Sequence, residues 1–205
     1  SMHLSEPSGP GNPEIHTVFV RKPLRVLQKE TCFKTTDGVE LDHAPFTLEV
    51  LDERFRNDDN KHIVISSVHF PPSSRANARD TQLKAFLADY TTKSNVRMHR
   101  PFTTQGAKDA RMNEAIHLIA GDFNSYPEFE NMGFSSPLLG SKISTSSGNQ
   151  AYDNFLLNRD STSRLCWCAE VLELANIKKK SEDGLSDHHP ILLKIIEQSV
   201  TTRKK

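Results

Sequence analysis

Near the middle of this chain stands an apolar run that stops at a polar turn, Ile116-His117-Leu118-Ile119-Ala120-Gly121-Asp122-Phe123-Asn124. A short apolar run bounded by a turn signal is typical of a strand inside a sheet, so residues 116–120 predict a strand. Asp122 and Asn124 follow directly after it. Functional side chains are concentrated on loops that a rigid scaffold positions. The stretch therefore predicts an element of an α/β fold and, at its end, a candidate site.

Three other segments repeat this arrangement. Two of them are Tyr152-Asp153-Asn154-Phe155-Leu156-Leu157 and Ser186-Asp187-His188-His189-Pro190, each next to an apolar run. The third is the predicted strand 62–68, which ends at His69. Acidic, amide and imidazole side chains at strand ends suggest a hydrolytic site. Each segment alone is a weak indication of such a site, and the four in this order are a strong one.

The four segments resemble, in order, motifs of the endonuclease/exonuclease/phosphatase superfamily: its strand-terminal histidine and its GDFN, YDN and SDHxP motifs. Members of this superfamily include deoxyribonuclease I, AP endonucleases, inositol-phosphate 5-phosphatases and neutral sphingomyelinases. The matching segments span residues 62–196. The resemblance implies an α/β fold, namely a four-layer α/β sandwich in which two β-sheets face each other with helices outside.

The amino-terminal part departs from the family pattern. Typical members carry there a strand with a metal-site asparagine and then a glutamate that binds the divalent ion. No Asn or Glu in such a strand context precedes His16. We therefore expect the chain to correspond to the carboxy-terminal two-thirds of the domain, with a complementary amino-terminal segment as a partner. Ala44 also stands where many relatives have an arginine before the proline, and its side chain cannot contact a phosphate.

The chemistry of phosphate-ester hydrolysis suggests roles for these residues. The reaction needs an activated water, positive charge on the phosphoryl oxygens and help for the leaving group. Asp122 would orient or deprotonate the water, and Asn124 would hold a phosphate oxygen. Histidine has the pKa range for proton transfer near neutrality, so His188 would contact the phosphoryl group or act as base and acid.

The resemblance implies the remaining roles. Asp153 would fix the tautomer of His188, and His69 would be a second imidazole that faces the phosphate. Asp187, together with Asp122, would bind the metal. Because carboxylates bind hard cations, the expected ion is Mg²⁺ or Mn²⁺.

The Ala-Tyr-Asp and Ser-Asp-His-x-Pro patterns are closest to the deoxyribonuclease I-like branch. They predict a metal-dependent phosphodiesterase that hydrolyses DNA, with DNA favoured over RNA. Two alternatives stay open. One is a different phosphoesterase of the same superfamily, and the other is a degenerate domain that binds nucleic acid or a partner without catalysis.

The stretch 92–114 is basic and lacks periodicity. It is either a solvated or disordered loop or an insertion that faces nucleic acid, in which lysines and arginines neutralise phosphates. In the second case Arg97, Arg100 and Arg111 would contact the nucleic acid.

The rest of the chain is predicted from composition and periodicity. We expect a flexible arm at 1–14, the superfamily domain at 15–198 and a basic tail at 199–205. Further strands are predicted at 16–20, 24–27, 46–51, 152–157, 165–174 and 191–196. A helix is predicted at 77–91, with Asn77 as its cap. His43 is interpreted as an ordinary histidine.

Composition sets outer limits. A chain of 205 residues, 36% hydrophobic and 25% charged, is typical of a soluble globular domain. Its formal charge of zero argues against a surface that is basic throughout, although it allows a local basic cleft. No apolar stretch approaches the roughly 18 residues of a membrane span. The three cysteines cannot all pair and favour free thiols in a reducing compartment, so we expect an intracellular protein of the nucleus or cytoplasm.

Overall fold

The computed structural model describes part of the chain. The described residues are 1–11, 13–53, 62–91, 116–125, 133–136, 138, 145, 152–158, 165–172, 188 and 191–197. Asp187, Arg97, Arg100, Arg111 and the predicted tail 199–205 lie outside them.

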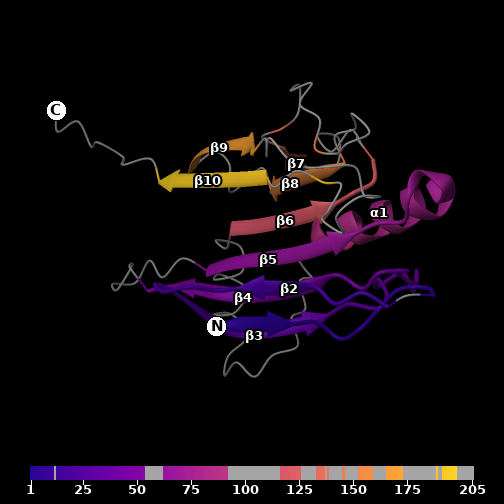
Figure 1. The fold of residues 1–205 in the computed structure, drawn as a ribbon, viewed down its shortest axis with the longest axis horizontal. Helices are drawn as coiled ribbons and strands as arrows, with labels where there is room; N and C mark the ends of the chain where they lie inside the picture. The colour runs from indigo at the N-terminus through magenta and orange to yellow at the C-terminus, as the bar shows by residue number, and fades with distance from the viewer. Residues whose placement is uncertain are drawn as a thin grey trace, which may run out of the picture.

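A six-stranded mixed sheet forms the centre of the fold (Figure 1). Its strands, in spatial order, are β3 (Leu24–Thr31), β4 (Phe46–Asp52), β5 (His62–His69), β6 (Ile116–Asp122), β8 (Asp153–Asn158) and β7 (Phe134–Ser135). The β5–β6 pair is parallel, and the other pairs in this sheet are antiparallel. A parallel pair needs a crossover connection, and the chain between β5 and β6 supplies one that includes helix α1 (Ala76–Thr91).

One face of this sheet is covered by α1. Leu83, Phe86 and Leu87 of the helix are almost fully buried. They belong to one apolar cluster with sheet residues that include Val68 and Ile119. Burial of each large apolar side chain contributes about 1.5–3 kcal/mol, so this cluster holds the helix on β5 and β6. The stripe predicted from helical periodicity is confirmed as core for these three residues.

The opposite face is covered by two small antiparallel sheets, β1 (Met2–Leu4) with β2 (Thr17–Phe19) and β9 (Leu165–Val171) with β10 (Ile191–Glu197). Val20, which follows β2, packs in a cluster with β4, and Trp167 of β9 packs in a cluster with Leu157 of β8. Ile63 of β5 packs against both clusters, so both small sheets lie on the same face. In Figure 1, β2 overlaps β4, and β9 and β10 lie next to β8. The predicted α/β sandwich is confirmed.

The predicted strands are all present, with shifted ends. β6 continues to Asp122, so this residue closes the strand instead of following it. The prediction that Asn77 caps the helix is wrong. A 3₁₀ turn, η1 (Ser73–Arg75), leads directly into α1 at Ala76, so the amino end of the helical segment lies at Pro72.

The segment 1–14, predicted as a flexible arm, is folded onto the domain. It contains β1, and Ser8 and Glu14 form a bridge. Its amino-terminal nitrogen donates to Val20 O at 2.7 Å, and Ser8 Oγ accepts from Ala44 N at 2.8 Å. Its mobility, like the boundaries of the predicted domain, stays a prediction. No helix in the described parts of the chain is long and apolar enough to cross a membrane.

Candidate active site

Strand register brings three predicted site residues into one row. In the ladders of the central sheet, His69 at the end of β5 is paired with Asp122 of β6, and Asp122 is paired with Asp153 of β8. Side chains of directly paired residues project from the same face of a sheet. The pair of His69 with Asp122 lies two residues beyond the pair of Ser67 with Ala120, so both pairs share one face of the sheet. This face is opposite α1, because the intervening Val68 packs in the cluster that contains the helix. The row therefore lies at the carboxyl ends of β5 and β6.

Gly121 lies where β6 runs directly against the backbone of β5. Its φ is +145°, a conformation that side chains rarely adopt. A Cβ atom at this position would lie 2.0 Å from Val68 O on the neighbouring strand. This explains why the Gly-Asp-Phe-Asn motif begins with a glycine. Without a side chain at this position, β6 can pair with β5 and place Asp122 beside His69.

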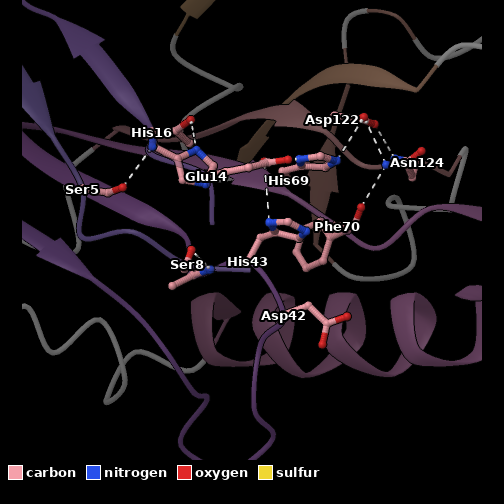
Figure 2. Close-up of polar contacts among 12 residues, drawn as sticks. Ser5, Ser8, Glu14, His16, Asp42, His43, His69, Phe70, Asp122 and Asn124 are labelled. Atoms are coloured by element: carbon pink, nitrogen blue, oxygen red, sulfur yellow. Dashed lines mark hydrogen bonds and ion pairs between the residues drawn. The ribbon is translucent and has the colours of Figure 1, made fainter. Parts of the chain in front are cut away.

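The turn after β6 holds the Asp122 carboxylate. Asn124 has a positive φ of 47°. Its backbone N–H donates to Asp122 Oδ1 at 2.7 Å. Its side-chain Nδ2 donates to Phe70 O at 2.9 Å and to Asp122 Oδ2 at 3.1 Å (Figure 2). Arg79 Nη1 of α1 donates to Asn124 O at 2.7 Å, so the helix braces this turn. The predicted contact of Asn124 with a phosphate oxygen stays a prediction.

Two imidazole–carboxylate pairs flank Asp122. His188 Nδ1 donates to Asp153 Oδ2 at 2.7 Å, and His69 Nδ1 donates to Glu14 Oε2 at 2.7 Å. The Nε2 atoms of His188 and His69 lie 3.9 Å and 3.6 Å from Asp122 Oδ2. A carboxylate on Nδ1 fixes the orientation of the ring and leaves Nε2 for chemistry. Both rings therefore present Nε2 toward the same carboxylate.

Two of these carboxyl groups have opposite pKa shifts. Burial raises the pKa of Asp122, and the nearby charge of Asp153 adds to this, while the hydrogen bond from Asn124 opposes it. Burial also raises the pKa of Glu14, but the hydrogen bond and charge of His69 outweigh it, so the net pKa is lowered. Environments that push neighbouring pKa values apart are typical of acid–base sites.

Glu14 and His43 are site residues that the sequence pattern does not predict. Glu14 is not in a strand, and it lies 55 residues before its partner His69. The ring of His43 stacks on that of His69, with 4.6 Å between centroids and 16° between planes. Glu14 stands in a Ser-, Pro- and Gly-rich stretch whose composition predicts a flexible arm. The sequence therefore contained no sign that Glu14 belongs to the site. For His43, the only signal was its place beside Ala44, at the departure from the family pattern.

The described residues do not by themselves form the oxygen-rich site expected for Mg²⁺ or Mn²⁺. Among them, the one group of three or more potential ligands close enough to share an ion consists of Glu14, His43 and His69, within 4.8 Å of one another. Mg²⁺ prefers oxygen ligands, whereas this group offers two imidazoles and one carboxylate. Asp187 lies outside the described residues, so a Mg²⁺ or Mn²⁺ site at Asp122 and Asp187 stays a prediction.

Comparisons with known proteins show the fold. No protein-family model and no curated protein matches the chain. The catalytic domain of human Nocturnin with bound sulfate is similar over 95% of this chain and 70% of its own, at 11% identity and a TM-score of 0.61. D. rerio TDP2 complexed with a single-strand DNA product is similar over 95% and 76%, at 18% identity and a TM-score of 0.54. These proteins belong to the endonuclease/exonuclease/phosphatase superfamily. This chain has the fold of that superfamily.

A third neighbour widens the range of chemistry within the superfamily fold. ANGEL2, a 2′,3′-cyclic phosphatase, in complex with adenosine-2′,3′-vanadate, is similar over 95% of this chain and 73% of its own, at 14% identity and a TM-score of 0.56. The resemblance predicted from the four motifs is confirmed at the level of the fold. At such low identity the likeness carries no substrate to this chain, so the roles of the site residues rest on the geometry above.

Proposed function

We propose that this chain is a phosphodiesterase that hydrolyses DNA. One observation carries the proposal: Asp122 lies between two imidazoles, and each imidazole is held by its own carboxylate. Hydrolysis of a phosphodiester needs a proton acceptor for the attacking water and a proton donor for the leaving oxygen. Two oriented imidazoles on either side of one carboxylate supply both functions.

The mechanism assigns a role to each group. Asp122 orients the attacking water, and its raised pKa makes it a better proton acceptor than an ordinary aspartate. His188, held through Nδ1 by Asp153, transfers a proton through Nε2. His69 presents a second Nε2 toward the same point, and a protonated imidazole there stabilises negative charge on the phosphoryl oxygens.

The proposal includes a divalent ion and nucleic-acid contacts beyond the described residues. Mg²⁺ or Mn²⁺, held by Asp122 and Asp187, would supply further charge stabilisation when bound. Arg97, Arg100 and Arg111 would contact phosphates of the substrate. A complementary amino-terminal segment would supply the missing metal glutamate. The TDP2 neighbour with its DNA product supports DNA as the substrate, and the ANGEL2 neighbour makes a cyclic phosphate the second candidate.

The test compares three substrates with the purified chain: single-stranded DNA, bis-p-nitrophenyl phosphate and adenosine 2′,3′-cyclic phosphate. We expect cleavage of DNA and of the aryl diester with Mg²⁺ or Mn²⁺ to be weak for the chain alone and stronger with an added amino-terminal segment, and to be lost with EDTA. His188→Ala should lower turnover by about 10²–10⁴-fold because it removes a general acid–base group. The fold should be unchanged by circular dichroism.

The matched control is His62→Gln. His62 has the same kind of carboxylate partner, Glu49 Oε1 at 2.7 Å, but lies at the opposite end of β5. It should retain turnover. Cleavage of the cyclic phosphate alone would favour the second candidate. DNA binding without cleavage of any substrate, even with an added amino-terminal segment, would favour the non-catalytic alternative.

A further inference from the structure

A cluster of metal-ligating side chains adjoins the proposed active site. Glu14 comes from the segment before β2, His43 from the loop before β4, and His69 from the end of β5. Glu14 Oε2 lies 2.7 Å from His69 Nδ1 and 3.5 Å from His43 Nδ1. Figure 2 shows the three side chains pointing toward one another, with Asp122 on the far side of the His69 ring.

His43 supplies a buried nitrogen without a hydrogen bond. Its side chain is 11% exposed, and its Nδ1 has no hydrogen-bond partner in the described part of the chain. Leaving a buried polar atom unsatisfied costs about 1–3 kcal/mol, so such an atom calls for an explanation. This Nδ1 points at Glu14, where an ion shared by the three side chains would also contact it. Burial lowers the pKa of His43, so the ring is neutral and its lone pair is available near neutrality.

The donor set matches zinc chemistry. Two histidines and one glutamate, with a fourth position left open, are a ligand set that Zn²⁺ uses in proteins. Tetrahedral bonds of about 2.0–2.1 Å place ligand atoms about 3.3 Å apart. The Glu14–His43 distance of 3.5 Å is already close to this spacing, whereas the Glu14–His69 distance of 2.7 Å has to lengthen. The stacked rings of His43 and His69 also have to turn, because an imidazole binds a metal ion in its own ring plane. The Glu14 side chain is 47% exposed, which gives it room to move and gives an ion access.

We propose that Glu14, His43 and His69 form a Zn²⁺ site that switches off the adjacent hydrolytic site. A zinc ion on His69 Nδ1 takes the place of the proton shared with Glu14. Zinc then occupies the atom through which Glu14 holds the His69 ring, so the ring no longer keeps the orientation that places its Nε2 3.6 Å from Asp122 Oδ2. Zinc binding follows from the cluster alone, and only the inhibition rests on the proposed function.

Direct binding tests the site. The complete chain, freed of metal, is titrated with Zn²⁺ in competition with a chromogenic chelator, and Co²⁺ is used as a spectroscopic probe. We expect one Zn²⁺ to bind tightly to each chain. Glu14→Gln and His43→Gln should each weaken binding at least about tenfold, as loss of a zinc ligand does, and His62→Gln should not change it. The Co²⁺ spectrum should lack a thiolate charge-transfer band, which separates this site from the free thiols of Cys32 and Cys168.

Two results would overturn the site: zinc binding to His43→Gln as tight as to the wild type, or a thiolate band in the Co²⁺ complex. Glu14→Gln guards against a folding defect in the His43 variant, because Glu14 is half exposed and its loss leaves the core intact. Circular dichroism verifies both variants.

Inhibition is measured separately, as the ratio of turnover with and without Zn²⁺ at saturating Mg²⁺. This ratio should fall for the wild type and for His62→Gln, and stay near one for His43→Gln, whose side chain has no role in the proposed reaction. Glu14→Gln is left out of this comparison because Glu14 holds His69. Equal inhibition of all three proteins would overturn the switch. If no protein has turnover, the proposed function fails while the binding titration still decides the zinc site.

Discussion

Single positions show how narrowly the site is constrained by its backbone. Gly121 lies against Val68 O, in a backbone conformation that other residues rarely adopt, directly before Asp122. Gly38 also has a positive φ, +83°, but nothing lies within 4 Å of its would-be Cβ. It belongs to a turn, where its N–H donates to Thr35 O at 2.9 Å. Substitutions at these two glycines therefore separate the free-energy cost of a strained backbone conformation from the cost of a steric clash.

We expect Gly121→Ala to lower the free energy of unfolding by about 2–5 kcal/mol, because strain and a backbone clash add. Gly38→Ala should cost about 1–2 kcal/mol, the conformational part alone. Urea denaturation of both variants measures the difference. Equal losses would mean that β5 and β6 separate easily, and close approach of the two strands would then not be the reason for a glycine at position 121.

The raised pKa of Asp122 predicts a pH dependence of stability. The ordinary pKa is 3.8, and in the folded protein it is higher because of burial. As pH rises from 3.8, the unfolded chain loses this proton first, so the wild type loses stability until the folded pKa is passed. Asp122→Asn lacks this loss. The stability of the variant relative to wild type should therefore increase as the pH rises above about 4 and level off once the folded pKa of Asp122 is passed.

Urea titrations in chelator-treated buffer measure this difference without a contribution from bound metal. Asp80→Asn is the control, because Asp80 is exposed on α1. A difference for Asp122→Asn that falls or stays level over the same range would contradict the raised pKa.

Among the secondary-structure elements, α1 does more than cover the sheet. Its Arg79 holds the turn after β6, and its Asp89 Oδ2 accepts from Thr36 N at 2.8 Å. Gln82 Oε1 accepts from Asp42 N at 3.0 Å, next to His43. One helix therefore positions both the Asp122 turn and the loop that carries His43. This explains how side chains on irregular segments keep a defined geometry.

Packing between β8 and the β9–β10 sheet can be tested through Leu157. This side chain is fully buried and shares an apolar cluster with Trp167 and Leu193. Leu157→Ala should lower the free energy of unfolding by about 2–5 kcal/mol. Leu192→Ala, on the outer face of β10 and 36% exposed, should stay within about 0.5 kcal/mol of wild type.

Trp167 is the only tryptophan of the chain, so its fluorescence reports on the β9–β10 sheet directly. Unfolding followed by fluorescence and by circular dichroism should coincide in the wild type. A small effect of Leu157→Ala would show that the β9–β10 sheet is not held by this cluster.

For the whole molecule, the site depends on contacts between distant parts of the chain. His69 meets Glu14 across 55 residues, and His188 meets Asp153 across 35 residues. Both pairs converge on the carboxyl ends of β5 and β6. The two small sheets cover the same face of the central sheet on which His69, Asp122 and Asp153 project. The arrangement therefore exists only when both ends of the chain are folded against the central sheet.

Strand periodicity and the four motifs were enough to predict the α/β sandwich, the strands and the grouping of His69, Asp122, Asp153 and His188. Strand periodicity is local, and the motifs mark strand ends, which a sheet brings together in a predictable way. Only the folded chain shows that Glu14 and His43 belong to the site. The same holds for the hydrogen bonds by which Asn124 holds Asp122. These contacts depend on how segments without periodicity cross in space, and no local pattern of residues encodes which side chains then meet.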